Sequence, residues 1–224
     1  MKLKFLNYLF VILLSFLFSA CGGKSSNEIR YVAIGASDAT GVGANPLTKG
    51  YVFLIEDGLE ASIDKEVNLV NLGIPGATAD IIEDVELPLA KNANPDLVTI
   101  FMGGNDINDG VSVEDFGNRV RSVVQGIAND TKAFVVIATL PDVSMLPRFQ
   151  EKPDTDVSTA KVQAYNNEIR SIANDFGVPI VDLENEPVED YLISNDGFHP
   201  NNEGYEKIAS KFLDVILPFF GAQT

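Results

Sequence analysis

Cysteine and histidine are almost absent from this sequence, which has one of each in 224 residues and no tryptophan. The single cysteine excludes a disulfide within the chain. One cysteine and one histidine are also too few for the clusters of these residues that hold zinc. We therefore expect neither a disulfide framework nor a metal, and the sequence predicts no cofactor.

Basic residues are also scarce. The 16 lysines and arginines are outnumbered by 32 aspartates and glutamates, for a formal net charge of -16. An acidic surface repels nucleic acid, so nucleic-acid binding is excluded as an expected function. The hydrophobic fraction of 46% argues against disorder, and the length suits one domain of ordinary size.

Long apolar runs are confined to the start of the chain. Lys2 and Lys4 precede an apolar stretch that continues to Phe18, and Ser19-Ala20-Cys21 follows. This is the layout of a secretory signal peptide, and the small residues before Cys21 favour cleavage over an uncleaved membrane anchor. No later apolar stretch is long enough to span a bilayer.

The position of Cys21 resembles the bacterial lipoprotein signal, in which the cysteine is lipidated and becomes the new N-terminus. Phe18 departs from the usual leucine, and an ordinary signal peptide with an incidental cysteine is the alternative. Gly22 after the cysteine favours the outer membrane in double-membrane bacteria. The resemblance implies a signal peptide over 1–20, a flexible tether over 21–28 and an exported domain over 29–220, held at the membrane by lipid.

From residue 29 onward, apolar β-rich runs alternate with helical patterns. Apolar residues recur at three- and four-residue steps within 113–127, 165–176 and 205–219, which predicts helices there. The predicted strands are Tyr31–Ile34, Val67–Leu72, Leu97–Met102, Phe134–Thr139 and Pro179–Leu183. Strands that are apolar almost throughout should be buried on both faces. The sequence thus predicts an α/β fold in which a five-stranded parallel sheet has helices on both faces.

Polar and glycine-rich segments follow the predicted strands, where ligands bind in such sheets. They are GASD at 35–38, NLGIPGAT at 71–78, GGND at 103–106 and, after a short loop, SNDGFHP at 194–200. His199 has Asp196 three residues before it, and a carboxylate that close can hold one imidazole nitrogen. The other nitrogen is then free to accept the proton of Ser37, since a serine hydroxyl is a weak nucleophile without a base.

Three groups offer hydrogen bonds to an oxyanion: the N–H of Ser37, the N–H of Gly73 and the side-chain amide of Asn105. Taken in order, Ser37, Gly73, Asn105 and His199 resemble the four sequence blocks of the SGNH (GDSL-type) hydrolases. The resemblance implies a flavodoxin-like three-layer α/β/α sandwich and ester hydrolysis. It also implies Ser37 as nucleophile, His199 as base, Asp196 as the group that orients the base, and Gly73 and Asn105 as oxyanion donors.

One residue departs from that family's pattern. The usual first block reads Gly-Asp-Ser, whereas this chain has Gly35-Ala36-Ser37. The missing acid leaves the bonding of the loop in question, and Asp38 is a candidate to take over part of it.

Each site residue also has a simpler interpretation. Ser37 could cap a helix, Gly73 and Asn105 could serve turns, and His199 could be a surface residue. Two competing motifs fail: the segment at 41–46 lacks the third glycine of a dinucleotide fingerprint, and the segment at 35–39 lacks the last glycine of a nucleophile elbow. A surface binding module with an unused site is the alternative function.

The substrate is left open among short-chain esters, lysophospholipids, acetylated sugars and thioesters, and so is the oligomeric state. The segment at 140–157 is long for a connection in this fold, and long loops are often lids or binding loops. Met145, Leu146 and Phe149 make it apolar. We expect these three side chains to contact the acyl group, with packing against the core as the alternative.

Overall fold

The computed structural model describes residues 27–154 and 156–221 and contains five parallel strands. The predicted signal peptide and Cys21 lie outside the described residues. The strand order is β2-β1-β3-β4-β5, and every neighbouring pair is parallel. The strands are β1 (Glu28–Gly35), β2 (Glu66–Asn71), β3 (Leu97–Phe101), β4 (Phe134–Ala138) and β5 (Ile180–Val181). The predicted sheet is confirmed, although β5 is shorter than the predicted strand.

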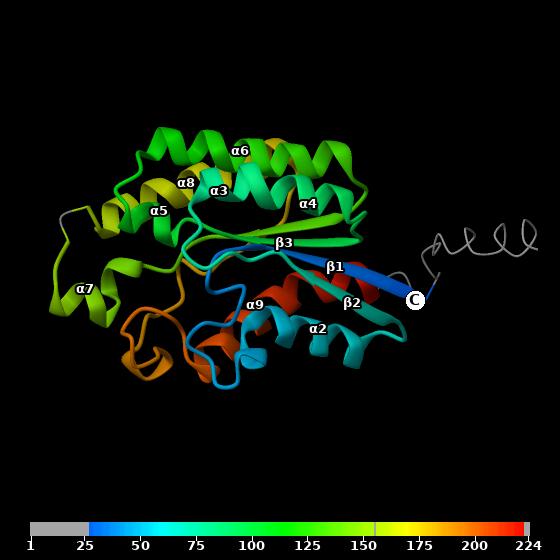
Figure 1. Cartoon of the computed structure of the whole chain (residues 1–224), viewed down its shortest axis with the longest axis horizontal. Coiled ribbons are helices and arrows are strands. Elements are labelled where there is room, and N and C mark those ends of the chain that lie inside the picture. The colour runs from blue at the N-terminus through cyan, green and yellow to red at the C-terminus, as the bar shows by residue number, and fades with distance from the viewer. Residues whose placement is uncertain (1–26, 155, 222–224) are drawn as a thin grey trace, which may run out of the picture.

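Helices cover both faces of the sheet, as Figure 1 shows. One layer, above the sheet in that view, contains α3 (Ala79–Ile81), the π-helical segment η2 (Ile82–Glu86), α4 (Leu87–Asn92), α6 (Val113–Asp130) and α8 (Thr159–Phe176). The other layer contains α2 (Tyr51–Ser62) and α9 (Asn202–Gly221), which pack on each other. The three predicted helices correspond to α6, α8 and α9. The result is the predicted three-layer α/β/α architecture.

Burial explains why these runs form a sheet. All five residues of β3 are buried, as are the last five of β1. Within this apolar centre the hydroxyls of Tyr31 and Thr99 satisfy each other at 2.9 Å. The side chains of Ser112 and Ser158 each accept a free backbone amide in the first turn of α6 and of α8, respectively. Gly177 ends α8 with a φ of 64°.

Five short elements lie in the connections: η1 (Leu47–Lys49), α5 (Gly104–Asn108), η3 (Val143–Met145), α7 (Pro147–Glu151) and η4 (Asp190–Leu192). None of the helices within 27–154 and 156–221 combines the length and hydropathy needed to cross a membrane.

The order in which strands are added to the sheet changes direction at β1. β2 lies on one side of β1, while β3, β4 and β5 extend from the other. Ligands bind at such a switch point, outside the carboxyl ends of the strands. In Figure 1 this edge lies at the left, and the start of β1 lies at the opposite end of the molecule.

Candidate active site

Ser37 lies two residues beyond β1 in a turn that is held by its own carbonyl. That oxygen accepts the amide of Thr40 at 3.2 Å, the amide of Val42 at 3.1 Å and the Thr40 hydroxyl at 2.9 Å. The strand before it ends on a glycine because a Cβ at position 35 would lie 2.6 Å from the carbonyl oxygen of Phe101. No helix begins at Ser37, so the helix-cap interpretation does not apply.

The Ser37 hydroxyl contacts the imidazole of His199, which lies 162 residues further along the chain. Ser37 Oγ is 2.8 Å from His199 Nε2, and His199 Nδ1 is 2.6 Å from Asp196 Oδ2. The side chains of Ser37 and His199 are both largely buried, while Asp196 reaches solvent. The structure therefore brings the three predicted catalytic residues into one hydrogen-bonded chain.

Asp196 also folds the loop that carries His199. Its Oδ1 accepts the amides of Phe198 and His199 at 2.8 and 2.9 Å and the Ser194 hydroxyl at 2.8 Å. Partial burial alone would raise the pKa of Asp196. The hydrogen bonds from His199, Phe198 and Ser194 outweigh that effect and hold the pKa well below its usual range. Asp196 is therefore a carboxylate at neutral pH, as a partner for the imidazole requires.

Asn105 lies in α5, at the start of the connection after β3. Gly103, with a φ of 116°, turns the chain there, and the Asn105 amide donates to the carbonyl of Ala77 at 2.9 Å. One amide hydrogen satisfies Ala77 and the second is left for another acceptor. The next residue, Asp106, is buried and accepts the amide of Ala79 at 2.9 Å. These contacts fix the connection after β3 against the loop after β2.

The predicted oxyanion donor Gly73 lies in the loop after β2. Its N–H donates to Asn71 Oδ1 at 3.0 Å, so it already has an acceptor. Three residues later, Gly76 has a φ of 84° and lies beside Ala77, the partner of Asn105. No hydrogen bond to another described residue engages the N–H of Gly76. The N–H of Gly76 is thus available in this loop, and its signal in the sequence was a second glycine in the same segment.

An apolar cavity of about 120 Å³ opens beside Ser37 and Asn105. Much of its wall is formed by apolar side chains from the connections after β4 and β5 and from α9: Leu140, Val143, Leu146, Leu183, Val188, Leu192, Ile193, Phe198 and Ile208. Two ion pairs lie at its margin, Lys211–Glu186 at 2.6 Å and Lys207–Glu189 at 3.6 Å. The space next to the nucleophile therefore suits an apolar group.

Asp38 lines the same cavity directly after Ser37. Its Oδ1 is 3.4 Å from the Tyr205 hydroxyl, which makes a shorter bond to the carbonyl of Val42 at 2.6 Å. Burial raises the pKa of Asp38, and attraction to His199 only partly offsets this. The sequence made Asp38 a candidate for bonding within the loop. In the structure its side chain contacts Tyr205 instead, and its place in the cavity wall was not predicted.

The three predicted acyl contacts differ in where they lie. Leu146 lines the cavity, whereas Met145 is 51% exposed and lies outside it. Phe149 is buried against Phe198, with ring centroids 6.0 Å apart, and is not part of the cavity wall. The geometry therefore favours Leu146, because Met145 points to solvent and Phe149 packs into the core; a contact of these two side chains with the acyl group stays a prediction.

Phe149 instead supports the loop that carries His199. The Arg148 amide donates to the carbonyl of Gly197 at 2.9 Å, and the Arg148 guanidinium lies 5.5 Å from the centre of the Phe198 ring. Phe198 in turn contacts the His199 ring edge to face, with centroids 4.9 Å apart. Helix α7 is thus packed against the histidine loop.

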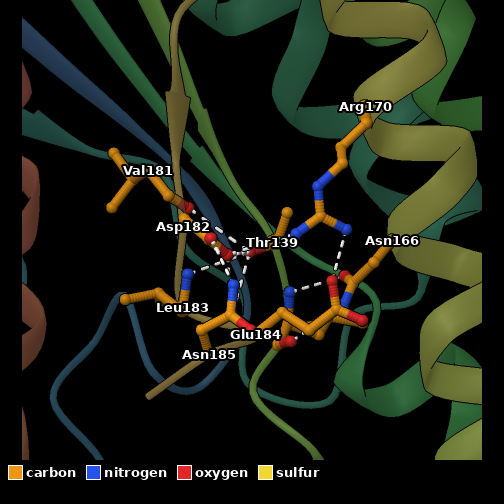
Figure 2. Close-up of polar contacts among 9 residues, drawn as sticks. Thr139, Asn166, Arg170, Val181, Asp182, Leu183, Glu184 and Asn185 are labelled. Atoms are coloured by element: carbon orange, nitrogen blue, oxygen red, sulfur yellow. Dashed lines mark hydrogen bonds and ion pairs between the residues drawn. The ribbon is translucent and has the colours of Figure 1, made fainter.

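A polar network joins the end of β4, helix α8 and the residues after β5 (Figure 2). Thr139, at the end of β4, accepts the amides of Leu183 and Glu184 through its hydroxyl oxygen at 2.9 and 3.1 Å. From α8, Arg170 contacts both Asp182 and Glu184.

The same helix also fixes Leu140. The buried amide of Asn166 accepts the backbone N–H of Leu140 at 2.8 Å and donates to its carbonyl at 2.9 Å. The wall residues Leu140 and Leu183 therefore rest on hydrogen bonds rather than on apolar packing alone.

Within 27–154 and 156–221, no group of three or more His, Cys, Asp and Glu side chains is arranged to hold a metal ion. The chemistry available at this edge is that of an oriented imidazole, a buried hydroxyl and several amide donors. These groups can activate a nucleophile and stabilise an oxyanion.

A family model described as GDSL-like Lipase/Acylhydrolase matches residues 33–207. A search of the curated proteins found no match. Among solved structures, TesA is 21% identical, with a TM-score of 0.69 over 84% of this chain and 98% of its own.

Two further structures have the same fold. The lipase/acylhydrolase from Enterococcus faecalis is 22% identical, with a TM-score of 0.69 over 84% of this chain and 95% of its own. Axe2, an acetylxylan esterase from Geobacillus stearothermophilus, is 21% identical, with a TM-score of 0.68 over 83% of this chain and 93% of its own.

Proposed function

The chain belongs to the GDSL-like lipase/acylhydrolase family, and on this premise we propose that it is a serine esterase whose nucleophile is Ser37. The observation that carries the proposal is the hydrogen-bonded chain from Ser37 through His199 to Asp196. Asp196 accepts Nδ1–H of the imidazole, which leaves Nε2 to take the serine proton.

The reaction proceeds in two halves. Ser37 Oγ attacks the ester carbonyl as its proton passes to His199 Nε2, and the imidazolium then protonates the departing alcohol. Ser37 is left acylated. A water molecule next attacks the acyl carbon and gives a proton to Nε2. The carboxylic acid leaves as Ser37 regains that proton.

The negative charge on the carbonyl oxygen is stabilised by amide donors. We assign this role to the N–H of Ser37, the second amide hydrogen of Asn105 and the N–H of Gly76. The Asn105–Ala77 bond holds the last two groups near each other. One donor of this kind typically contributes about 10²–10³ to kcat.

The cavity beside Ser37 is where we place the acyl group of the substrate. An apolar cavity of roughly 150 Å³ holds a molecule of the size of benzene. A cavity of about 120 Å³ with this apolar lining therefore suits an acyl chain of roughly four to six carbons. Butanoate and hexanoate esters are accordingly the first substrates to test.

The test of the proposed function is hydrolysis of 4-nitrophenyl esters from acetate to dodecanoate by the purified protein. Activity should peak near butanoate and hexanoate. It should fall by roughly 10⁴ or more in Ser37→Ala and in His199→Ala, with the melting temperature kept within a few degrees. If Ser37→Ala were as active as wild type, Ser37 would not be the nucleophile. A folded wild-type protein that hydrolyses none of these esters would favour the binding module.

We also propose that the protein is exported and lipid-anchored through Cys21, with the outer membrane as its site. The eight residues of β1 run from Glu28 to the edge that carries Ser37, roughly 26 Å away at about 3.3 Å per residue. An anchor before Glu28 would thus attach at the end of the domain opposite the cleft, which would then face away from the membrane.

Cys21→Ser should release the protein from membranes or block its processing. Unchanged retention with an intact N-terminus would contradict the lipid anchor.

A further inference from the structure

Glu86 is a buried acidic residue that the proposed reaction does not use. It lies at the end of the π-helical segment η2 and has no exposed surface. Acidic side chains are rarely buried to this extent unless they have partners. Short π-helical segments within α-helices are frequent at functional sites, which makes the contacts of this residue the next question.

The Glu86 carboxyl is bonded at the base of the loop that carries the nucleophile. Its Oε2 accepts the amide of Gly35 at 2.9 Å, two residues before Ser37. In a parallel ladder this amide would be expected to bond to the neighbouring strand, but beyond Asn71 the chain of β2 no longer continues as a strand. Ala36, which follows Gly35, has no side-chain acceptor to offer. Glu86 thus supplies the acceptor at this point.

The same carboxyl lies at the base of the second loop. The amide of Ile74 donates to the carbonyl of Gly35 at 3.2 Å and lies close enough to Glu86 to lower the pKa of its carboxyl. Ile74 is two residues before Gly76. Glu86 therefore holds the last residue of β1, and the carbonyl of that same residue binds the loop of the proposed oxyanion donor.

We propose that Glu86 is a positioning residue that sets the nucleophile loop and the loop of Gly76 relative to each other. This role rests on the proposed function, since it concerns the distance between the attacking oxygen and an oxyanion donor. Glu86 touches neither the substrate nor the reacting atoms. It acts through Gly35, whose amide it accepts and whose carbonyl accepts the amide of Ile74. In this chain it provides the loop bonding that Ala36 cannot provide.

The burial of the Glu86 carboxyl is consistent with a role in positioning rather than in stability. Burial raises the pKa of Glu86 to about 7, and the amides of Gly35 and Ile74 only partly offset this. Its second oxygen, Oε1, has no hydrogen-bond partner among the described residues, nor does the buried hydroxyl of Tyr51. A buried, half-satisfied carboxyl costs stability relative to an apolar side chain of similar size. Stability alone therefore does not explain Glu86.

The test compares three variants of the full chain with wild type: Glu86→Leu, Glu86→Asp and Glu86→Gln. Leucine offers no acceptor, and aspartate is one methylene too short to reach Gly35. In both, kcat for 4-nitrophenyl butanoate should fall roughly 10- to 100-fold while KM stays within about threefold. The amide oxygen of glutamine can still accept the Gly35 amide, so Glu86→Gln should recover kcat to within about fivefold of wild type. Asp84→Asn, an exposed change in the same segment, is the matched control and should match wild type.

Melting temperature and amide hydrogen exchange separate positioning from folding. The amide of Gly35 should exchange faster in Glu86→Leu, while the melting temperature does not fall. If Glu86→Leu does not fold, Glu86→Asp decides the question. Wild-type kcat in Glu86→Asp, or the same loss in Glu86→Gln as in Glu86→Leu, would overturn the proposal. Because wild type and Ser37→Ala are assayed alongside, failure of the esterase function is distinguished from failure of the role of Glu86.

Discussion

Single side chains in this site satisfy several partners at once. Asp196 holds the imidazole of His199 with one oxygen and three donors of its own loop with the other. Asn105 donates one amide hydrogen to the carbonyl of Ala77, and we assign the other to the proposed oxyanion. A substitution at either position therefore changes both the local backbone and the chemistry, and the two effects need separate measurements.

Asn105 allows that separation. Asn105→Ala removes an oxyanion donor and one hydrogen bond to Ala77, so kcat for a simple ester should fall by about 10²–10³. The melting temperature should fall by only a few degrees, as expected for about 1 kcal/mol. Asn105→Asp should be at least as slow, because a carboxylate offers no donor and repels the oxyanion. Near-normal turnover in Asn105→Asp would show that Asn105 is not an oxyanion donor.

At the scale of elements, α7 and the histidine loop behave as one unit. Phe149 packs on Phe198, and Phe198 packs on His199. Leu146, three residues before Phe149, faces the cavity instead. The apolar character of this segment was visible in the sequence, but which side chain faces the substrate depends on the short helices η3 and α7, which the pattern did not reveal.

Leu146 and Phe149 should therefore differ in their effects on catalysis. Leu146→Ala enlarges the cavity and should shift the preferred ester by roughly one or two carbons toward longer chains. Phe149→Ala loosens the loop of His199 and should lower kcat for all chain lengths by a similar factor. Met145→Ala, at an exposed position, serves as the control. Equal profiles for Leu146→Ala and Met145→Ala over acetate to dodecanoate would show that the acyl group binds elsewhere.

Much of the fold and the pairing of Asp196 with His199 could be predicted from the sequence, because each depends on short-range information. The partner of His199, Ser37, lies 162 residues away and was predicted from the order of the four sequence blocks. The apolar runs locate the strands, and Asp196 lies three residues from His199 in the chain. Gly73 and Glu86 required the structure. The amide of Gly73 is engaged by Asn71, two residues earlier. The carboxyl of Glu86 reaches a strand 51 residues away, and a buried glutamate in a helix resembles a surface residue when only the sequence is known.

At the scale of the whole molecule, buried acids determine how stability changes with pH. Burial raises the pKa of Glu86 to about 7 and that of Asp106 to about 6. Both values lie above those of an unfolded chain, roughly 4. Between about pH 4 and pH 7 the folded protein therefore binds more protons than the unfolded one. The free energy of unfolding falls as pH rises through this range. Below about pH 4 the lowered pKa of Asp196 has the opposite effect.

The melting temperature should thus decrease from pH 5 to pH 8, by roughly 5 °C or more given the size of these pKa shifts. Glu86→Gln and Asp106→Asn should each flatten the decrease, because each removes one titrating group. Differential scanning calorimetry at constant ionic strength checks this, with Asp84→Asn as the exposed control. A melting temperature that rises steadily to pH 8 would contradict the assignment of buried, proton-binding acids.

The most direct measurement of the central claim is covalent labelling by a fluorophosphonate, with the site of modification located by mass spectrometry. A nucleophilic Ser37 activated by His199 should form a single adduct on the peptide that contains Ser37. Labelling should vanish in Ser37→Ala and slow by orders of magnitude in His199→Ala. An unlabelled but folded wild-type protein, or an adduct on another serine that persists in Ser37→Ala, would contradict the claim.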